Sequence, residues 1–312
     1  MASYSCNGIQ IEAETFGDPK DPCLLLIMGL GMQLTAWHEG FCRMLAEDGF
    51  YVVRFDNRDV GLSTHFEQHG RPMVPMLLFQ KFIGLTPKAP YTLKEMAVDT
   101  VALLDQMKIQ QAHVIGASMG GMIAQALAIE YPERVLSLTS IMSTTGARSL
   151  PGPTAQARRA LLQPVPKQAN NKTAEGIQLL VDGYVKTFSV IGSQKFLPKN
   201  DQEMSVFRAR ISNNIKRSYR PWGVARQMAA ILGSPDRTSG LRKLSVKSLV
   251  IHGMEDPLVQ PVCGEATAQA IPNARLEMIA DMAHDLPEPL WRKISRLISE
   301  HAHSAPSRAT GA

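Results

Sequence analysis

The chain has 312 residues, enough for one large domain or for a domain with a sizeable insertion. Its 45% hydrophobic and 20% charged residues are ordinary for a folded globular protein and argue against intrinsic disorder. The net charge is +5, but the basic residues are scattered. A mild basic cluster between Arg208 and Arg220 lacks the aromatic and basic interleaving of nucleic-acid sites, so we interpret it as a solvated helix face and expect no nucleic-acid partner.

The cysteines and the apolar runs bear on the cellular compartment. Four cysteines (Cys6, Cys23, Cys42 and Cys263) show no CxxC or metal-ligand spacing, which indicates free thiols in a reducing compartment. The N-terminus lacks the basic and then apolar pattern of a secretory signal, and no run approaches the roughly 20 apolar residues of a membrane span. We expect a cytoplasmic protein without a membrane span, for which a homodimer stays open.

Strands and helices are expected to alternate along most of the chain. An N-terminal hairpin precedes near-continuous apolar runs, which are typical of strands buried on both faces of a parallel sheet. Helical spacing, and a capping box at Thr92, indicate helices between the strands. The expected strands are 23–29, 51–56, 112–118, 135–143, 246–253 and 274–280, and the expected helices include 93–104, 119–131 and 287–301. This order predicts an α/β fold with a mostly parallel eight-stranded sheet and helices on both faces.

The alternation stops between residues 146 and 233, where proline-rich linkers lead into helical patterns. Within this segment, apolar residues from Ile177 to Phe188 recur at i, i+3 and i+4. We expect a core of 1–145 and 234–302, an inserted helical cap of 146–233, and a disordered tail of 303–312. We also expect Pro72–Pro90 to form an apolar loop, either an ordinary buried one or a wall that binds an acyl group.

The stretch from Gly116 to Gly120 reads G-x-S-x-G, with a predicted strand before it and a predicted helix after it. Such a turn holds its serine in a sparsely populated backbone conformation, and small neighbours avoid a clash. The helix N-terminus favours negative charge that develops near the serine. Ser118 is therefore the candidate nucleophile, and the alternative is a simple packing turn.

A serine hydroxyl needs a general base, and on a turn of this kind the acid and the histidine follow the serine in that order. Of eight histidines, His284 lies in the loop between the last strand and the final helix. Asp285 and Glu288 beside it are interpreted as helix-start residues. His252 lies within a strand and is expected to be a core or backbone-bonding residue. His284 is the candidate base.

The candidate acid is Asp256, which follows a buried strand in a turn closed by Pro257. Its neighbour Glu255 is interpreted as a solvated loop residue. A second possible position for the acid, after the strand that follows the nucleophile helix, reads "SIMSTTGARS" and contains no carboxylate. Together these residues predict a Ser118–Asp256–His284 triad.

An oxyanion hole requires two backbone N–H groups. We expect one from Met119, directly after the serine, and one from Leu30 in the loop "MGLGMQ". The charged loop with Asp56 and Arg58 is interpreted as a structural element held by local hydrogen bonds. Metal and phosphate motifs are missing from the sequence, so no cofactor and no metal is expected.

The motifs "LLLIMGLGMQLTAW", "VVRFDNRDVGLS", "VIGASMGGMIAQALA", "LVIHGMEDPLVQP" and "DMAHDLP" resemble the α/β-hydrolase fold. They resemble in particular its esterase branch, with aclacinomycin methylesterase-like enzymes and bacterial carboxylesterases. The resemblance covers about residues 8–302 and is weakest in the cap. The oxyanion loop departs from it, because it has neither the His-Gly start nor the triple glycine of other branches, which argues against esters of bulky tertiary alcohols.

The resemblance implies hydrolysis of a carboxylic ester through an acyl-enzyme. The residues predict a serine carboxylesterase for small to medium apolar esters, with a small-molecule ester as its partner. The alternatives are a lactonase, a perhydrolase or a prolyl aminopeptidase of the same fold, and a ligand receptor that has kept the triad. An aminopeptidase would need acidic residues for a free amine, and the cap offers only scattered ones (Glu175, Asp182, Asp201 and Glu203).

Overall fold

The computed structural model describes residues 1–305, and within them eight strands form one sheet in the order β1-β2-β4-β3-β5-β6-β7-β8. β1 with β2, and β2 with β4, pair antiparallel, and the following pairs are parallel. The predicted fold class is therefore confirmed. The strands are β1 (Ala2–Cys6), β2 (Ile9–Phe16), β3 (Cys23–Ile27), β4 (Tyr51–Phe55), β5 (Ala112–Ala117), β6 (Val135–Ile141), β7 (Lys247–Gly253) and β8 (Arg275–Ile279).

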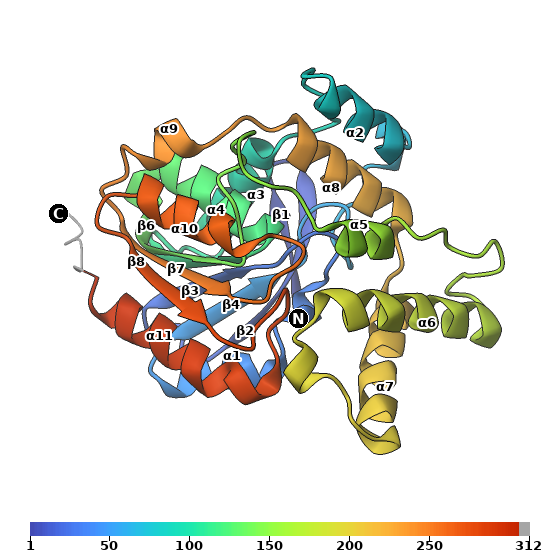
Figure 1. The fold of residues 1–312 in the computed structure, drawn as a ribbon. Coiled ribbons are helices and arrows are strands. Elements are labelled where there is room, and N and C mark those ends of the chain that lie inside the picture. The colour runs from blue at the N-terminus through green and yellow to red at the C-terminus, as the bar shows by residue number, and fades with distance from the viewer. Residues whose placement is uncertain (306–312) are drawn as a thin grey trace.

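Helices cover both faces of the sheet (Figure 1). One face carries α3 (Leu93–Gln106), α4 (Met119–Glu130) and α10 (Pro261–Ala270), and the other carries α1 (Glu39–Glu47) and α11 (Trp291–His303). Every residue of β3 and β5 is buried, which explains their unbroken apolar runs. The capping box at Thr92 is present at the start of α3, as predicted.

The segment 146–233, for which the sequence predicts a cap and which is called the cap below, contains four α-helices, which are α5 (Ala155–Leu161), α6 (Ala174–Ile191), α7 (Asp201–Arg217) and α8 (Pro221–Gly233). The predicted apolar stripe of α6 packs against α7 in a small core of its own, with Leu180 and Val181 from one helix and Ile211 and Ile215 from the other. The two helices project from the sheet domain side by side (Figure 1).

The predicted apolar loop at Pro72–Pro90 is wrong for its central part. Val74–Phe82 forms helix α2, because Pro75 lies in the first turn, where its missing N–H is not required. The segment is therefore not a buried loop, and its role as a wall that binds an acyl group stays a prediction. Within α2 only Leu77 is buried, and most other apolar side chains are exposed.

Three further α-helices were not predicted, which are α5, α9 (Thr238–Leu241) and α10, and the boundaries of α11 differ from the prediction. The sequence predicts no element over α5 and α10, although Thr154 caps α5 through its side chain and Pro261 begins α10. α11 continues through His303, into the predicted tail. Residues 306–312 of that tail lie outside the described residues.

The four cysteines are buried free thiols, as predicted. Along residues 1–305, no helix combines the length and the apolar character that crossing a bilayer requires.

Candidate active site

Ser118 lies at the sharp turn between the end of β5 and the start of α4. Its φ of 56° and ψ of −119° lie outside the regions that non-glycine residues ordinarily adopt, as the motif predicts. Two hydrogen bonds hold this conformation. The Ser118 amide donates to the Ile141 carbonyl at 2.9 Å, and the Ser143 hydroxyl donates to the Ser118 carbonyl at 2.8 Å.

The glycines of the turn are required by close backbone contacts. A Cβ added at Gly116 would lie 2.1 Å from the Gly120 carbonyl oxygen, and one added at Gly120 would lie 2.0 Å from the Ile27 carbonyl oxygen. Neither distance is compatible with a side chain, and backbone atoms cannot rotate away as a side chain can. The turn, the first turn of α4 and the end of β3 are therefore packed directly against one another.

The structure brings the three predicted catalytic residues together. His284 Nε2 lies 2.9 Å from Ser118 Oγ, and His284 Nδ1 lies 2.7 Å from Asp256 Oδ2. Asp256 is 2% exposed and His284 9% exposed, so solvent competes little for these hydrogen bonds. The side chains come from three loops that follow β5, β7 and β8, and all three loops lie at the carboxyl edge of the parallel sheet.

Asp256 is fixed by its own turn. Its Oδ1 accepts hydrogen bonds from the amides of Leu258 at 2.8 Å and Val259 at 2.9 Å, which leaves Oδ2 directed at His284. Glu255 is exposed, as predicted for a solvated loop residue. The carboxylate that faces the histidine is therefore that of Asp256.

His252 is buried behind this carboxylate. Its Nε2 lies 2.7 Å from the Val259 carbonyl oxygen and 3.6 Å from Asp256 Oδ2. Burial lowers the pKa of His252, which favours the neutral ring. The prediction of a core residue that bonds the backbone is confirmed.

The loop that carries His284 is tied to the cap, and sequence reasoning missed this. The His284 amide donates to the carbonyl of Ile191 at 2.9 Å, at the C-terminal end of α6. The Ala283 amide donates to Ser193 Oγ at 2.9 Å, and the Ser193 amide and hydroxyl both donate to the Asp285 carboxylate. Burial raises the pKa of Asp285, and the hydrogen bonds from Ser193 act in the opposite direction.

Asp285 is therefore not a helix-start residue, and that part of the prediction is wrong. The short 3-10 helix that precedes α11 begins only at Glu288, with Pro287 at its N-cap. The reason is tertiary, because Ser193 comes from the cap, 92 residues away in the sequence. A pattern within one loop could not have shown this contact.

The loop after β3 lies directly beside the serine. A Cβ added at Gly29 would lie 3.1 Å from Ser118 Cβ and 3.5 Å from Ser118 Oγ. Among residues 1–305, the amides of Leu30 and Met119 donate no hydrogen bond to a protein group. Both N–H groups belong to backbone next to the serine, and Met119 is the first residue of α4.

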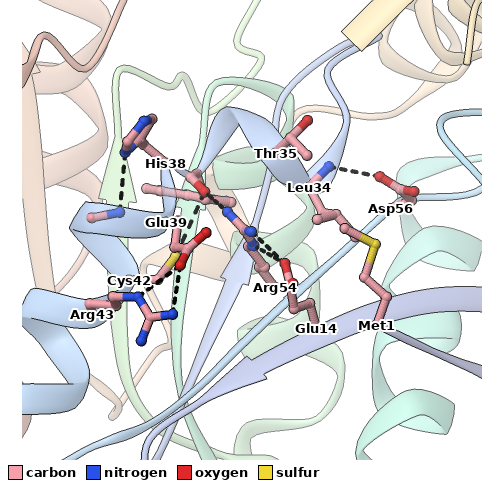
Figure 2. Close-up of polar contacts among 12 residues, drawn as sticks. Met1, Glu14, Leu34, Thr35, His38, Glu39, Cys42, Arg43, Arg54 and Asp56 are labelled. Carbon is pink, nitrogen blue, oxygen red and sulfur yellow. Dashed lines mark hydrogen bonds and ion pairs between the residues drawn. The ribbon is translucent and has the colours of Figure 1, made fainter. Parts of the chain in front are cut away.

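Three side chains hold this loop. Asn57 Nδ2 donates to the Met28 carbonyl at 2.9 Å, and Gln227 Oε1 accepts from the Gly31 amide at 2.8 Å. The Leu34 amide donates to Asp56 Oδ1 at 2.7 Å (Figure 2). Gly31 needs its glycine, because its φ is +67° and a Cβ would lie 2.9 Å from Val224 in the cap.

The loop with Asp56 and Arg58 is held by local and by remote contacts, and not by local ones alone as predicted. Asp56 Oδ2 accepts from the Leu62 amide at 2.9 Å and pairs with Arg217 of α7 at 2.8 Å. Arg58 forms a buried ion pair with Asp99 at 2.5 Å. The solvated helix face predicted for the basic cluster is therefore wrong for Arg217, whose guanidinium reaches a fully buried carboxylate.

A second buried arginine stabilises the sheet below the loop. Arg54 of β4 donates to Glu14 of β2, as Figure 2 shows, and it also donates to the Trp37 carbonyl. Its guanidinium also lies 4.9 Å from the centre of the Phe16 ring. In the part of the chain that the structure describes, no group of three or more His, Cys, Asp or Glu side chains could hold a metal ion.

The sequence from 22 to 288 matches the family model described as the alpha/beta hydrolase fold. The chain belongs to the α/β-hydrolase family. Rhodomycin D methylesterase from Streptomyces sp. is 26% identical over 313 residues, which cover 95% of this chain and 96% of that protein. A 3-oxoadipate enol-lactonase from Acinetobacter baylyi is 26% identical over 280 residues, which cover 89% and 87%.

Solved structures of other proteins have the same fold as this α/β hydrolase. The enol-lactonase from Burkholderia xenovorans aligns with a TM-score of 0.72 at 22% identity, covering 97% of this chain and all of that one. A thermophilic esterase from Thermogutta terrifontis aligns with a TM-score of 0.67 at 22% identity, covering 96% and 98%. The resemblance to the methylesterase branch is confirmed, because two of the relatives are named rhodomycin D methylesterases.

Proposed function

We propose that this α/β hydrolase is a serine carboxylesterase that cleaves small to medium apolar esters through an acyl-enzyme. The single observation that supports it most is the chain of hydrogen bonds from Ser118 Oγ through the His284 ring to Asp256, on a strained turn at a helix N-terminus. A turn that serves only for packing would not require a nucleophile, a base and a carboxylate in this arrangement.

In the proposed first half-reaction, Ser118 Oγ attacks the ester carbonyl carbon while His284 Nε2 takes the hydroxyl proton. Asp256 stabilises the imidazolium and keeps its Nδ1–H oriented. The negative charge on the carbonyl oxygen is stabilised by the amides of Leu30 and Met119. The tetrahedral species then collapses, the bond to the alcohol oxygen breaks, and His284 donates its proton to the leaving alcohol.

In the second half-reaction, a water molecule replaces the alcohol. His284 takes a proton from this water as its oxygen attacks the acyl carbon, and the same two amides stabilise the second oxyanion. Collapse breaks the bond to Ser118 Oγ, which regains its proton from His284. The products are a carboxylic acid and the free enzyme.

The surroundings of the site support apolar substrates. The Val224 side chain lies beside Gly31, and Leu30 in the same loop is an apolar residue. Two of the four acidic cap residues that an aminopeptidase could use are engaged in other contacts. Asp182 pairs with Arg208, and Glu203 bonds the residues that begin α7.

A lactonase is the second candidate, and the similarity to two enol-lactonases favours it. A lactone is a cyclic ester, so the same attack and the same oxyanion stabilisation would open its ring. The two candidates differ in one respect, because the alcohol stays attached to the acyl group in a lactone. Comparing p-nitrophenyl esters with simple lactones therefore distinguishes them.

The proposal is tested with p-nitrophenyl esters of increasing acyl length. We expect hydrolysis by the wild type, a loss of activity of several orders of magnitude in Ser118→Ala, and labelling of Ser118 alone by a fluorophosphonate, detected by mass spectrometry. An unchanged far-UV circular dichroism spectrum serves as the folding control for Ser118→Ala. Labelling at another residue, or an active Ser118→Ala variant, would rule the proposal out. Ligand binding without turnover of any ester or lactone would favour a receptor.

A further inference from the structure

The segment at and after α2 exposes a run of large apolar side chains. Phe82 is 87% exposed and Met73 69%, and the others are at least half exposed. We define the α2 patch by six residues, which are Met73, Met76, Phe79, Phe82, Ile83 and Leu85. Single exposed apolar residues are ordinary, but six within one short segment mark a surface that meets another apolar phase.

The charged residues of the chain segment that carries the α2 patch have one sign. No aspartate or glutamate occurs between Glu67 and Glu95, whereas Arg71, Lys81 and Lys88 lie in that stretch. Arg148 joins them, because its guanidinium donates to the Gly84 carbonyl at 2.9 Å. Arg148 comes from another stretch without acidic residues, from 135 to 174.

A tryptophan lies at the edge of the same surface. The Arg71 guanidinium lies 4.9 Å from the centre of the Trp222 ring, so the two side chains stack. Trp222 is 46% exposed, whereas Trp37 and Trp291 are buried. Tryptophan is the side chain that membrane interfaces favour most, since its ring is apolar and its N–H is polar.

The α2 patch is fastened to the cap. α2 stands at the periphery of the molecule beside α8 (Figure 1). Lys81 Nζ donates to the Leu232 carbonyl at 3.0 Å, near the end of α8. α8 also carries Gln227, whose side chain bonds the loop beside Ser118. The α2 patch and the loop beside Ser118 are therefore both held by α8.

We propose that the α2 patch docks the protein on an anionic lipid surface. The apolar side chains would enter the boundary between headgroups and acyl chains, while Arg71, Lys88 and Arg148 lie at the level of the lipid phosphates. A second copy of this chain fits less well. A two-fold interface places the same residues opposite one another, so cations would meet cations with no carboxylate between them.

The test uses the full chain with vesicles of phosphatidylcholine alone and of equal parts phosphatidylcholine and phosphatidylglycerol. We expect co-sedimentation and a blue shift of Trp222 fluorescence with the anionic vesicles, and at least tenfold weaker binding to the neutral ones. Binding should weaken as salt is raised from about 0.05 M to about 0.5 M, because surface charges are then screened. Hydrolysis of a water-soluble ester is independent of this surface, so the result does not depend on the proposed function.

Two variants and two matched controls locate the binding surface. We expect at least tenfold weaker binding from the double variant Phe79→Ser, Phe82→Ser and from the double variant Lys88→Gln, Arg148→Gln. For the second variant, the reason is that each cation near the surface strengthens binding about fivefold. Val206→Ser replaces an equally exposed apolar residue on α7, and Lys20→Gln an exposed cation before β3. Both controls should bind as the wild type does.

Three results would overturn the proposal. The first is no binding to anionic vesicles, and the second is equal binding by the wild type and the Phe79→Ser, Phe82→Ser variant. The third is a wild type that sediments as a dimer while that variant sediments as a monomer, with neither bound to vesicles. In this last case the α2 patch would be an interface between copies of the chain.

Discussion

At the scale of single residues, the candidate site is a set of strained or close contacts that small residues make possible. Ser118 adopts a positive φ, and Gly116, Gly120 and Gly29 leave the space that its turn requires. A conformation of this kind costs about 1–3 kcal/mol, which the packing of β3, β5 and α4 must offset. The strained backbone therefore belongs to the residue whose hydroxyl we propose as the nucleophile.

The carboxylate has a testable role of its own. Asp256→Asn keeps the size of the side chain but offers its amide N–H or its oxygen to His284 in place of a charge, so the productive tautomer is lost. We expect kcat to fall by about 10⁴-fold with the fold intact. Steady-state kinetics on a p-nitrophenyl ester measures this.

Glu255→Gln is the matched control, because this neighbour is exposed and should leave kcat unchanged. A large loss of kcat in Glu255→Gln, together with an active Asp256→Asn, would show that the acid is Glu255 and not Asp256.

The three triad positions could be predicted from the sequence because each follows a recognisable strand, which is buried for β5 and β7 and partly exposed for β8. Parallel strands bring their carboxyl ends to one edge, so residues far apart in the chain had to meet there. The support of the triad could not be predicted in this way. Ser193 and Asp285 are joined by a contact between the cap and the core, and neither residue lies in a motif.

At the scale of elements, α8 connects the cap with the loop beside the serine. Gln227 of this helix is fully buried, and it accepts from the Gly31 amide while donating to the Arg58 carbonyl at 2.8 Å. Arg226 beside it pairs with Asp59, which also accepts from the Tyr91 hydroxyl. These buried polar contacts fix α8 against the core at several points.

A substitution at Gln227 tests whether this support matters to the proposed chemistry. Gln227→Leu removes the acceptor of the Gly31 amide, so the Leu30 amide is held less precisely. We expect kcat to fall about tenfold or more with a smaller change in KM, because the oxyanion exists only in the transition state and not in the bound ester.

Gln227→Glu keeps the acceptor and should recover part of the loss. Thermal unfolding of both variants separates this effect from a general loss of stability. Equal kcat values in Gln227→Leu and the wild type would show that the loop is held without this residue.

Elements with strong local signals could be predicted, and those set by tertiary contacts could not. The capping box of α3 and the apolar stripe of α6 were both recognisable. Prolines within an apolar run favour the prediction of a loop over α2, although Pro75 suits a first helical turn. Its exposed apolar face also gave no pattern of a buried surface.

At the scale of the whole molecule, His113 and His301 are two of the buried histidines that make stability depend on pH. Burial lowers the pKa of His113 and of His301 to about 4, from an ordinary value of 6.5. Between these values the unfolded chain binds protons that the folded chain does not, so stability falls as the pH falls. It is fully present above pH 6.5, and each histidine contributes up to about 3 kcal/mol there.

Urea unfolding across the range from pH 6.5 to pH 4 measures this dependence. His301→Leu should reduce the loss of stability with falling pH, because the His301 ring no longer titrates. His69→Gln is the control, since His69 is exposed and its replacement should leave the slope unchanged. Identical slopes in the wild type and His301→Leu would contradict the assignment.

The contact between Ile191 and His284 has a consequence for engineering and for the divergence of such proteins. The end of α6 hydrogen-bonds the backbone of the residue that we propose as the base, and Ser193 braces the residues on either side of it. A cap transplanted from a relative would have to bring its own counterpart of residues 191–193 together with the histidine loop. The natural unit of exchange is therefore the cap plus that loop, although the two lie about ninety residues apart in the gene product.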